Sequence, residues 1–133
     1  MAASKILQPP DWFRPKGYAN GVLSHGRALF VSGMIGWDAD GQLVADDLVG
    51  QVGQALRNIV DVLAEGGATP DHIVRMTWYV VDKKEYITLS KEIGEVYREI
   101  IGYHYPAMTA IHVMDLMEEG ALVEIEATAM LPD

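Results

Sequence analysis

The stretch of sequence that decides the fold runs from residue 104 to residue 129 and reads HYPAMTAIHVMDLMEEGALVEIEATA. Two apolar runs, at about 107–114 and about 121–130, flank the acidic turn MEEGA, and apolar runs bounded by turn residues are typical of strands. The chain is therefore predicted to end in two strands.

The last of these strands is predicted to have two chemically different faces. Because side chains alternate along a strand, Val123 and Ile125 point to one side, whereas Glu124 and Glu126 point to the other. Two carboxylates on one face suit general acid–base chemistry if the face lines a pocket, and a solvated or ion-paired surface if it does not. The residues alone leave both interpretations open.

The strand before it raises a similar choice at Met108. This residue shares one face with Ala110 and His112, while Thr109 lies on the other. A methionine in such a position usually packs in a core, and a strand histidine is more often structural than catalytic. The pattern by itself predicts an ordinary packed strand.

The rest of the chain predicts two helices and three more strands. Two β-prone pieces, at about 20–24 and 27–34, are joined by a tight turn and predict a hairpin. Leu48 and the apolar residues that follow it at spacings of three and four predict a helix that Gly66–Gly67 ends. A strand in VRMTWYVV and a second helix at about 84–101 come next.

The order ββαβαββ predicts an α+β fold in which a single sheet carries two helices on one face. The other face then has no cover within the chain. Because half of the 133 residues are hydrophobic, we expect a partner subunit to cover it. Residues 1–133 are expected to form one domain, in which residues 1–18, with three prolines, form an irregular arm.

The charge balance narrows the choice of partners. Ten Lys and Arg against nineteen Asp and Glu give a net charge of −9, so neither nucleic acid nor an anionic membrane is expected as a partner. The absence of cysteine excludes disulfides and thiolate chemistry. No apolar run is long enough for a signal peptide or a membrane span, which favours a cytoplasmic protein.

Motifs for several other kinds of chemistry are missing. The sequence has no phosphate-binding loop and no dinucleotide fingerprint. Its four histidines are scattered and do not have metal-ligand spacing, so no metal site is expected. Ser32 in VSGM lacks the turn sequence of a hydrolase nucleophile.

Five segments together resemble the reactive intermediate deaminase family, also called the Rid or YjgF family. They are GYANGV (17–22), LFVSGMIG (29–36), QVGQALRNIVDVLAEGGATPDHIVRMTWYVVD (51–82), VYREIIGYHYPAMTAIHV (96–113) and VEIEATA (123–129). The resemblance covers nearly the whole chain and keeps the order of the segments. Its most specific part is the last pair of motifs, Y-P-A at 105–107 followed by V-E-I-E-A at 123–127.

The resemblance implies a chorismate mutase-like fold with a single mixed sheet, assembled as a homotrimer with small-molecule clefts between subunits. It also implies hydrolysis of enamines and imines, such as 2-aminoacrylate and its imine tautomer. In that reaction water attacks the imine carbon and ammonia leaves, and no cofactor is needed. Some members carry an endoribonuclease or translation-inhibitor label, against which the acidic balance of this chain argues.

The resemblance assigns roles to five positions. Tyr18 matches the tyrosine that closes the cleft, and Glu124 matches the acid that orients the attacking water. Ser32 and Gly33 match the Ser-Gly at the end of a strand. Thr109 matches a small hydroxyl residue that lines the cleft. The expected catalytic residues are therefore Tyr18, Ser32 and Glu124.

Met108 is a departure from the family pattern, because deaminating members have Arg in the sequence P-A-R-[ST]. The guanidinium there grips the substrate carboxylate through two parallel hydrogen bonds, which Met cannot donate. With Met108, Ala110 and His112 as substrate contacts, the cleft would favour a larger, more hydrophobic or aromatic substrate. Arg14 or Lys16 is the expected replacement cation, unless both are exposed charges on a loose arm.

Two functions follow from these residues. The first is an imine or enamine deaminase with altered substrate preference, supported by Tyr18, Ser32 and Glu124. The second is a non-catalytic small-ligand-binding or interaction trimer, supported by the missing Arg at position 108. An endoribonuclease is disfavoured by the net charge of −9.

Overall fold

The structure, a computed structural model, describes residues 4–133. The elements in chain order are β1 (Ser4–Leu7), β2 (Gly21–Ser24), β3 (Arg27–Met34), α1 (Leu48–Glu65), a 3-10 turn (Pro70–His72), β4 (Ile73–Val80), α2 (Lys83–Thr88), α3 (Ser90–Ile100), β5 (Ala107–His112) and β6 (Val123–Leu131).

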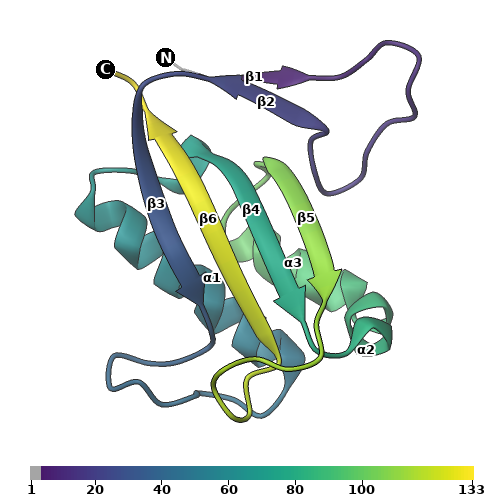
Figure 1. Ribbon diagram of the computed structural model, residues 1–133, viewed down its shortest axis with the longest axis vertical. Helices are drawn as coiled ribbons and strands as arrows, with labels where there is room; N and C mark the ends of the chain where they lie inside the picture. The colour runs from purple at the N-terminus through teal and green to yellow at the C-terminus, as the bar shows by residue number, and fades with distance from the viewer. Residues whose placement is uncertain (1–3) are drawn as a thin grey trace.

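Four of the strands form a mixed sheet in the order β3-β6-β4-β5 (Figure 1). β6 pairs antiparallel with β3 on one side and with β4 on the other, whereas β5 is parallel to β4. Helices α1 and α3 lie across one face of the sheet, behind it in Figure 1. The predicted α+β fold, with a mixed sheet and two main helices on one face, is confirmed.

The core lies between the helices and the sheet. Along β6, buried and partly buried side chains alternate, as the sequence predicts. The buried side chains of β6 include Val123, Ile125, Ala127 and Ala129. The apolar stripe that α1 contributes to the same core consists of Leu48, Val52, Leu56, Ile59 and Leu63. Glu124 and Glu126 are therefore left on the face that no helix covers.

The N-terminal part differs from the prediction in two ways. Residues 4–7 of the expected irregular arm form a strand, and residues 1–3 of that arm lie outside the described part of the chain. The predicted hairpin of β2 with β3 is wrong, because β2 pairs with β1 in a separate two-stranded ribbon and β3 pairs with β6. Figure 1 shows this ribbon standing away from the sheet.

Gly26 gives the physical reason for the missing hairpin. Its φ is +131°, and a Cβ at this position would lie 2.0 Å from the backbone oxygen of Leu131 at the end of β6. Only glycine tolerates both conditions. The chain therefore turns a corner against β6 at Gly26, which sends β3 into the sheet and leaves β2 to the ribbon.

The predicted second helix is present, but it is divided into α2 and α3 at Leu89. Asp82 caps the start of α2, because its side chain accepts a hydrogen bond from the backbone N–H of Glu85 at 3.0 Å. Backbone bonds pass through the division, since Leu89 donates to Glu85 and accepts from Ile93. None of the helices within residues 4–133 has the length and apolar character needed to cross a bilayer.

One buried polar side chain, that of Gln51 on α1, ties the helix to two long loops. The Nε2 atom of Gln51 donates to the backbone oxygens of Ala45, at 3.1 Å, and Gly120, at 2.9 Å. Its Oε1 atom accepts from the backbone N–H of Leu122 at 2.7 Å. Gln51 is fully buried, so these bonds are shielded from water. They fix the point at which the chain enters β6.

Replacing Gln51 tests this connection. Gln51→Leu leaves three backbone groups without their partner, and we expect the free energy of unfolding to fall by about 2 kcal/mol. Gln54→Leu on the same helix is the matched control, because Gln54 is only half-buried and bonds to one side chain, so we expect a loss below about 1 kcal/mol. Urea denaturation at one fixed protein concentration measures both. Equal losses would show that the Gln51 bonds do not stabilise this junction.

Candidate functional site

Six of the eight site residues that the sequence predicts line three separate hollows in a single chain. Tyr18 and Met108 line the first hollow. Gly33 and Glu124 line the second. Ser32 lines the third. A single copy of the chain therefore does not bring the predicted catalytic residues together.

The first hollow lies beyond β5, at the edge of the sheet, and we call it the edge cleft. It consists of two adjoining spaces of about 360 Å³ and 280 Å³. The residues that line both spaces are Lys16, Gly17, Trp78, Tyr86 and Met108. Tyr18 and the predicted substrate contact Ala110 line the smaller space only, whereas Arg98 lines the larger space only.

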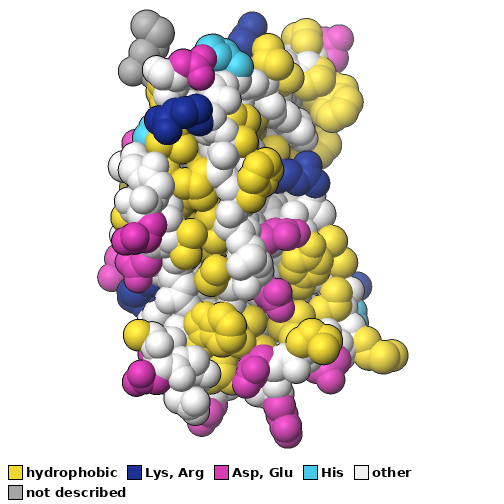
Figure 2. All heavy atoms as spheres, turned by 60° about the vertical axis from the view of Figure 1, so that its left-hand side comes forward, with side chains coloured by type: hydrophobic (Ala, Val, Ile, Leu, Met, Phe, Trp, Pro, Cys, Tyr) yellow, Lys and Arg dark blue, Asp and Glu magenta, His cyan; other side chains and the backbone are white. Residues whose placement is uncertain are grey.

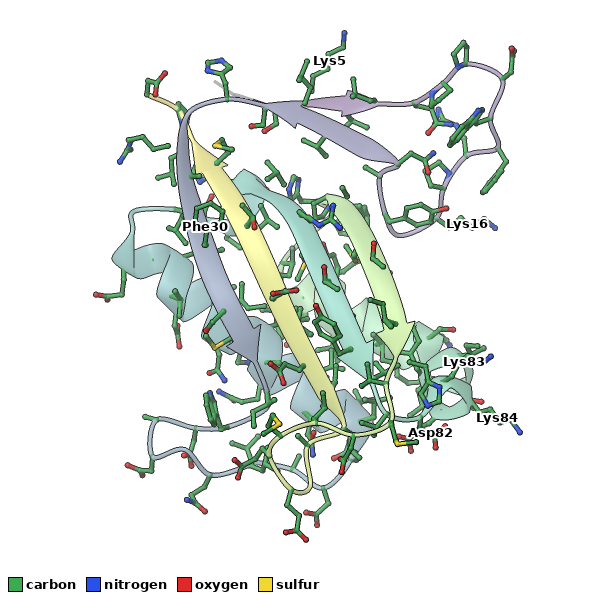
Figure 3. All side chains as sticks on the ribbon, in the orientation of Figure 1. Lys5, Lys16, Phe30, Asp82, Lys83 and Lys84 are labelled. Carbon is green, nitrogen blue, oxygen red and sulfur yellow. The ribbon has the colours of Figure 1, made fainter. Side chains whose placement is uncertain are left out.

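The N-terminal loop is held against the edge cleft by the backbone. Ala19 donates a hydrogen bond to the backbone oxygen of Pro106 at 2.9 Å and forms an isolated parallel bridge with Ala107 at the start of β5. Gly17 supplies the left-handed turn, with a φ of +77°, that brings the loop back toward the sheet. Figure 3 shows Lys16 on this loop, on the β5 side of the sheet.

Aromatic side chains form the wall of the edge cleft. The ring centroids of Trp78 and Tyr86 are 6.2 Å apart, and those of Trp78 and Tyr97 are 6.3 Å apart. Tyr97 stacks on Tyr105 at 5.5 Å. Burial raises the pKa of Tyr86 and of Tyr97, so both phenols stay neutral at physiological pH. The wall is thus apolar and uncharged.

Met108 both packs against the core and lines the cleft, which are the two roles that the sequence left open. It lies opposite the fully buried Met76 in the β4–β5 register and packs against the core. It also lines both spaces of the edge cleft. Its side chain is half-buried, so one part packs and another part faces the cleft. A flexible thioether suits such a boundary.

The second hollow, of about 220 Å³, brings Glu124 and Gly33 together across β6 and β3. A Cβ at position 33 would lie 2.0 Å from Oε2 of Glu124, so the absence of a side chain there makes room for the carboxylate. Within residues 4–133, Glu124 has no hydrogen-bond or ion-pair partner. Its carboxylate is therefore free to bind water or a ligand.

The third hollow, of about 430 Å³, lies on the uncovered face of the sheet. Ser32 and Glu126 are among its lining residues. Glu126 accepts a hydrogen bond from the hydroxyl of Tyr79 at 2.5 Å. This bond, followed by partial desolvation and the negative charges of Glu126 and Glu124, raises the pKa of Tyr79. The two acids of β6 thus differ, because Glu126 has a partner within the chain and Glu124 does not.

Three further candidates, Thr109, His112 and Arg14, are not among the residues that line the edge cleft. Thr109 is exposed on the uncovered face, opposite Thr77 in the β4–β5 register. His112 is exposed at the end of β5. Of the two expected replacement cations, Lys16 lines the edge cleft and Arg14 lies among the exposed residues of the loop.

Sequence reasoning missed the aromatic wall and Arg98. Trp78 and Tyr97 were visible only as parts of an apolar strand and an amphipathic helix, and helical spacing predicts packing rather than a site. The available signal was the number of aromatic residues between positions 78 and 105. Only the packing of α3 beside β4 and β5 brings these rings to one place.

The face of the molecule in Figure 2 shows no basic patch, and the described residues form no metal cluster. On the face that Figure 2 shows, Lys and Arg side chains stand apart from one another among hydrophobic and acidic ones. Among residues 4–133, no group of three or more His, Asp or Glu is arranged to hold a metal ion.

Comparisons with known proteins agree on one family. The Endoribonuclease L-PSP family matches residues 14–131. The chain is 32% identical to the 2-iminobutanoate/2-iminopropanoate deaminase of Homo sapiens over 85% of this chain and 79% of that protein. It is also 32% identical to a RutC family protein of Pyrococcus abyssi over 87% of this chain and 88% of that protein.

Solved structures show the same relationship. The crystal structure of YyfB from Yersinia pestis, described as a protein of unknown function of the conserved Rid family, superposes with a TM-score of 0.87. That chain is 33% identical, and the match covers 97% of this chain and 99% of that one. Both the sequence and the fold therefore place this chain among these proteins.

The bond between Tyr79 and Glu126 gives a pH prediction. Glu126→Gln removes the carboxylate that raises the pKa of Tyr79, so the pKa of this phenol should fall toward 10.0. Because the folded-state pKa is raised, the wild type loses stability as pH rises above 10.0, and Glu126→Gln should reduce this loss. Absorbance at 295 nm, with Tyr79→Phe to identify the signal, measures the titration. Glu99→Gln, exposed on α3, is the control and should leave the Tyr79 signal unchanged. An unshifted signal in Glu126→Gln would contradict the assigned cause.

Proposed function

Because the chain belongs to the Endoribonuclease L-PSP family, also called the Rid or YjgF family, we propose that it is an enamine/imine deaminase. In the proposed reaction, water adds to the carbon of a C=N bond. The C–N bond of the resulting amino alcohol then breaks, which leaves a carbonyl product and releases ammonia. The reaction consumes one water and needs no change of oxidation state.

The free carboxylate of Glu124 is the observation that supports this proposal best. A carboxylate without an internal partner, in a hollow open to solvent, accepts a hydrogen bond from water and takes up a proton as the water attacks. Gly33 leaves the space in which this carboxylate sits. Glu126 is less suited to the role because Tyr79 already occupies one of its oxygens.

The site is proposed to be completed by other copies of the chain, in a homotrimer. The edge cleft and the Glu124 hollow lie apart in one chain, since β4 separates β5 from β6 in the sheet. The uncovered face of the sheet carries Phe30, which is 76% exposed, beside the hollow that Ser32 and Thr77 line. Packing this face against another copy would bury Phe30 and bring Glu124 of one copy toward the edge cleft of the next.

Met108 supports a substrate preference different from that of a small 2-imino acid. An Arg–carboxylate contact in a shielded cleft contributes about 2–4 kcal/mol, so its absence weakens binding of a small acid by about 30- to 1000-fold. The aromatic wall of the edge cleft favours a larger, apolar group instead. We therefore assign a hydrophobic or aromatic imine as the preferred substrate.

The second candidate function is a non-catalytic, ligand-binding trimer, and Met108 is the observation that favours it. It shares the cleft and the assembly with the first candidate and differs only in the chemistry. A catalytic assay therefore separates the two.

The assay follows imines that an amino acid oxidase generates from aliphatic, aromatic and acidic amino acids, with semicarbazide as the trapping reagent. We expect the protein to accelerate decay of the aromatic imines most. Glu124→Gln should lower this rate by about 100-fold, because it removes the proton acceptor. Glu119→Gln, in the exposed turn before β6, is the control and should change the rate by less than about twofold. No acceleration with any imine would leave only the non-catalytic function.

Met108→Arg tests the preference. We expect the ratio of kcat/KM for alanine-derived to phenylalanine-derived imine to rise at least about tenfold, because a guanidinium is restored on β5. Met114→Arg is the matched control, since Met114 is 98% exposed and lies beyond β5. An unchanged ratio in a folded Met108→Arg variant would remove Met108 from the substrate contacts.

Phe30→Glu tests the assembly. A carboxylate on the uncovered face should dissociate the proposed trimer into monomers, because it would be buried without a partner between copies. Phe13→Glu is a closely matched control, since Phe13 is 75% exposed but lies in the N-terminal loop. Sedimentation velocity measures both variants beside the wild type. A trimeric Phe30→Glu variant would show that this face is not the interface.

A further inference from the structure

We infer that the larger space of the edge cleft binds the acid group of a ring-bearing carboxylic acid, with Arg98 as its cation and the indole N–H of Trp78 as a second donor. This inference rests on the proposed function only in that both use the edge cleft. It moves recognition of the acid group from β5, where Met108 stands, to the α3 side of the cleft.

The position of Arg98 supports the first part. Arg98 lines the larger space, and its guanidinium lies along α3 over Gly94, where a Cβ would come within 3.1 Å of it. Glycine inside a helix is destabilising by about 0.5–1 kcal/mol relative to alanine. At this position the missing side chain leaves room for the guanidinium to lie back along the helix.

Arg98 is available to a ligand because it has no carboxylate partner among the described residues. Among residues 4–133 the ion pair found is that of His25 with Asp133, at 4.0 Å, so neither Arg98 nor Lys16 is paired with a carboxylate. Both cations line the larger space, in a chain with nineteen acidic residues and a net charge of −9. Unpaired cations next to an apolar wall attract an anionic group more strongly than cations in open water do.

The indole of Trp78 supports the second part. Trp78 is 2% exposed, and its Nε1 atom is buried without a hydrogen-bond partner, although the ring lines both spaces of the cleft. Buried indole N–H groups usually have an acceptor. An oxygen of a ligand in the cleft would supply the missing acceptor, because Trp78 lines both spaces.

The wall of the cleft selects the rest of the ligand. Tyr86, Tyr97 and Tyr105 line the larger space, and the last two rings are stacked with an interplanar angle of 14°. The space of about 360 Å³ is in the size range of small-molecule sites and larger than a three-carbon acid requires. A ligand whose ring packs against the tyrosines and whose acid group points toward Arg98 would match both the aromatic wall and the size of the space.

The experiment uses the unreactive probe 3-phenylpropanoate on the full-length protein. Isothermal titration should show binding at least about tenfold tighter than that of the neutral 3-phenylpropanamide and of propanoate, which lacks the ring. Of the three tryptophan indole signals in a ¹H–¹⁵N spectrum, the Trp78 signal, identified with Trp78→Phe, should move most. Equal affinity for the acid and the amide, or an unmoved Trp78 signal, would overturn the inference.

Variants then locate the cation. Arg98→Gln should weaken binding of 3-phenylpropanoate at least about tenfold and leave binding of the amide within about twofold. Arg57→Gln is the matched control, because the guanidinium of Arg57 lies over Gly53 on α1 in the same i to i+4 relation and outside the described lining of the cleft. Equal effects of the two changes would remove Arg98 from the site. If Arg98→Gln does not fold, the acid–amide comparison on the wild type decides.

The results also separate this inference from the proposed function. Probe binding that depends on Arg98, without hydrolysis of any imine, would support the site and reject the deaminase. Hydrolysis of imines with no preference of the cleft for 3-phenylpropanoate over its amide would support the deaminase and reject the site.

Discussion

The pairing of β6 on both sides is the constraint on which the rest of the structure depends. β6 lies between β3 and β4, so its backbone groups are used by neighbours and only its side chains can vary. Their strict alternation puts Val123 and Ile125 under the helices and leaves Glu124 and Glu126 on the other face. A shift of one residue would exchange the two sets and bury two carboxylates in the core, which makes the register hard to change.

This constraint also gives the two acids different environments. Both face the same side, but Glu126 lies opposite Thr77 in the β4–β6 register and accepts a hydrogen bond from the hydroxyl of Tyr79. Glu124 lies nearer the start of β6, beside Gly33, where the β3–β6 register is irregular and no side chain competes for the space of the carboxylate. The bonds of Gln51 hold that start in place. Glu124 and Glu126 look equivalent in the sequence, but in the structure Glu126 is hydrogen-bonded to Tyr79 and Glu124 has no partner among the described residues.

The sequence predicted those features that depend on neighbouring residues. The helix from Leu48 and the two faces of β6 follow from local spacing, which the packing of the core preserves. It did not predict the partner of β2, because the sharp corner at Gly26 depends on contact with the distant Leu131. The edge cleft could not be predicted from the sequence for a similar reason. Trp78, Tyr97 and the N-terminal loop meet only in the folded chain.

The edge cleft resolves an apparent conflict between a chain with a net charge of −9 and an anionic ligand. At physiological ionic strength, charges in water are screened beyond about 8 Å, so the distant acids of the surface contribute little inside the cleft. Lys16 and Arg98 are the charges within the lining, and both lack a carboxylate partner in the described chain. The net charge of −9 therefore does not attract anions from a distance, and it does not steer an anionic ligand toward the cleft. Selection among acids would depend on fit against the tyrosine wall, which a small acid cannot fill and a ring can.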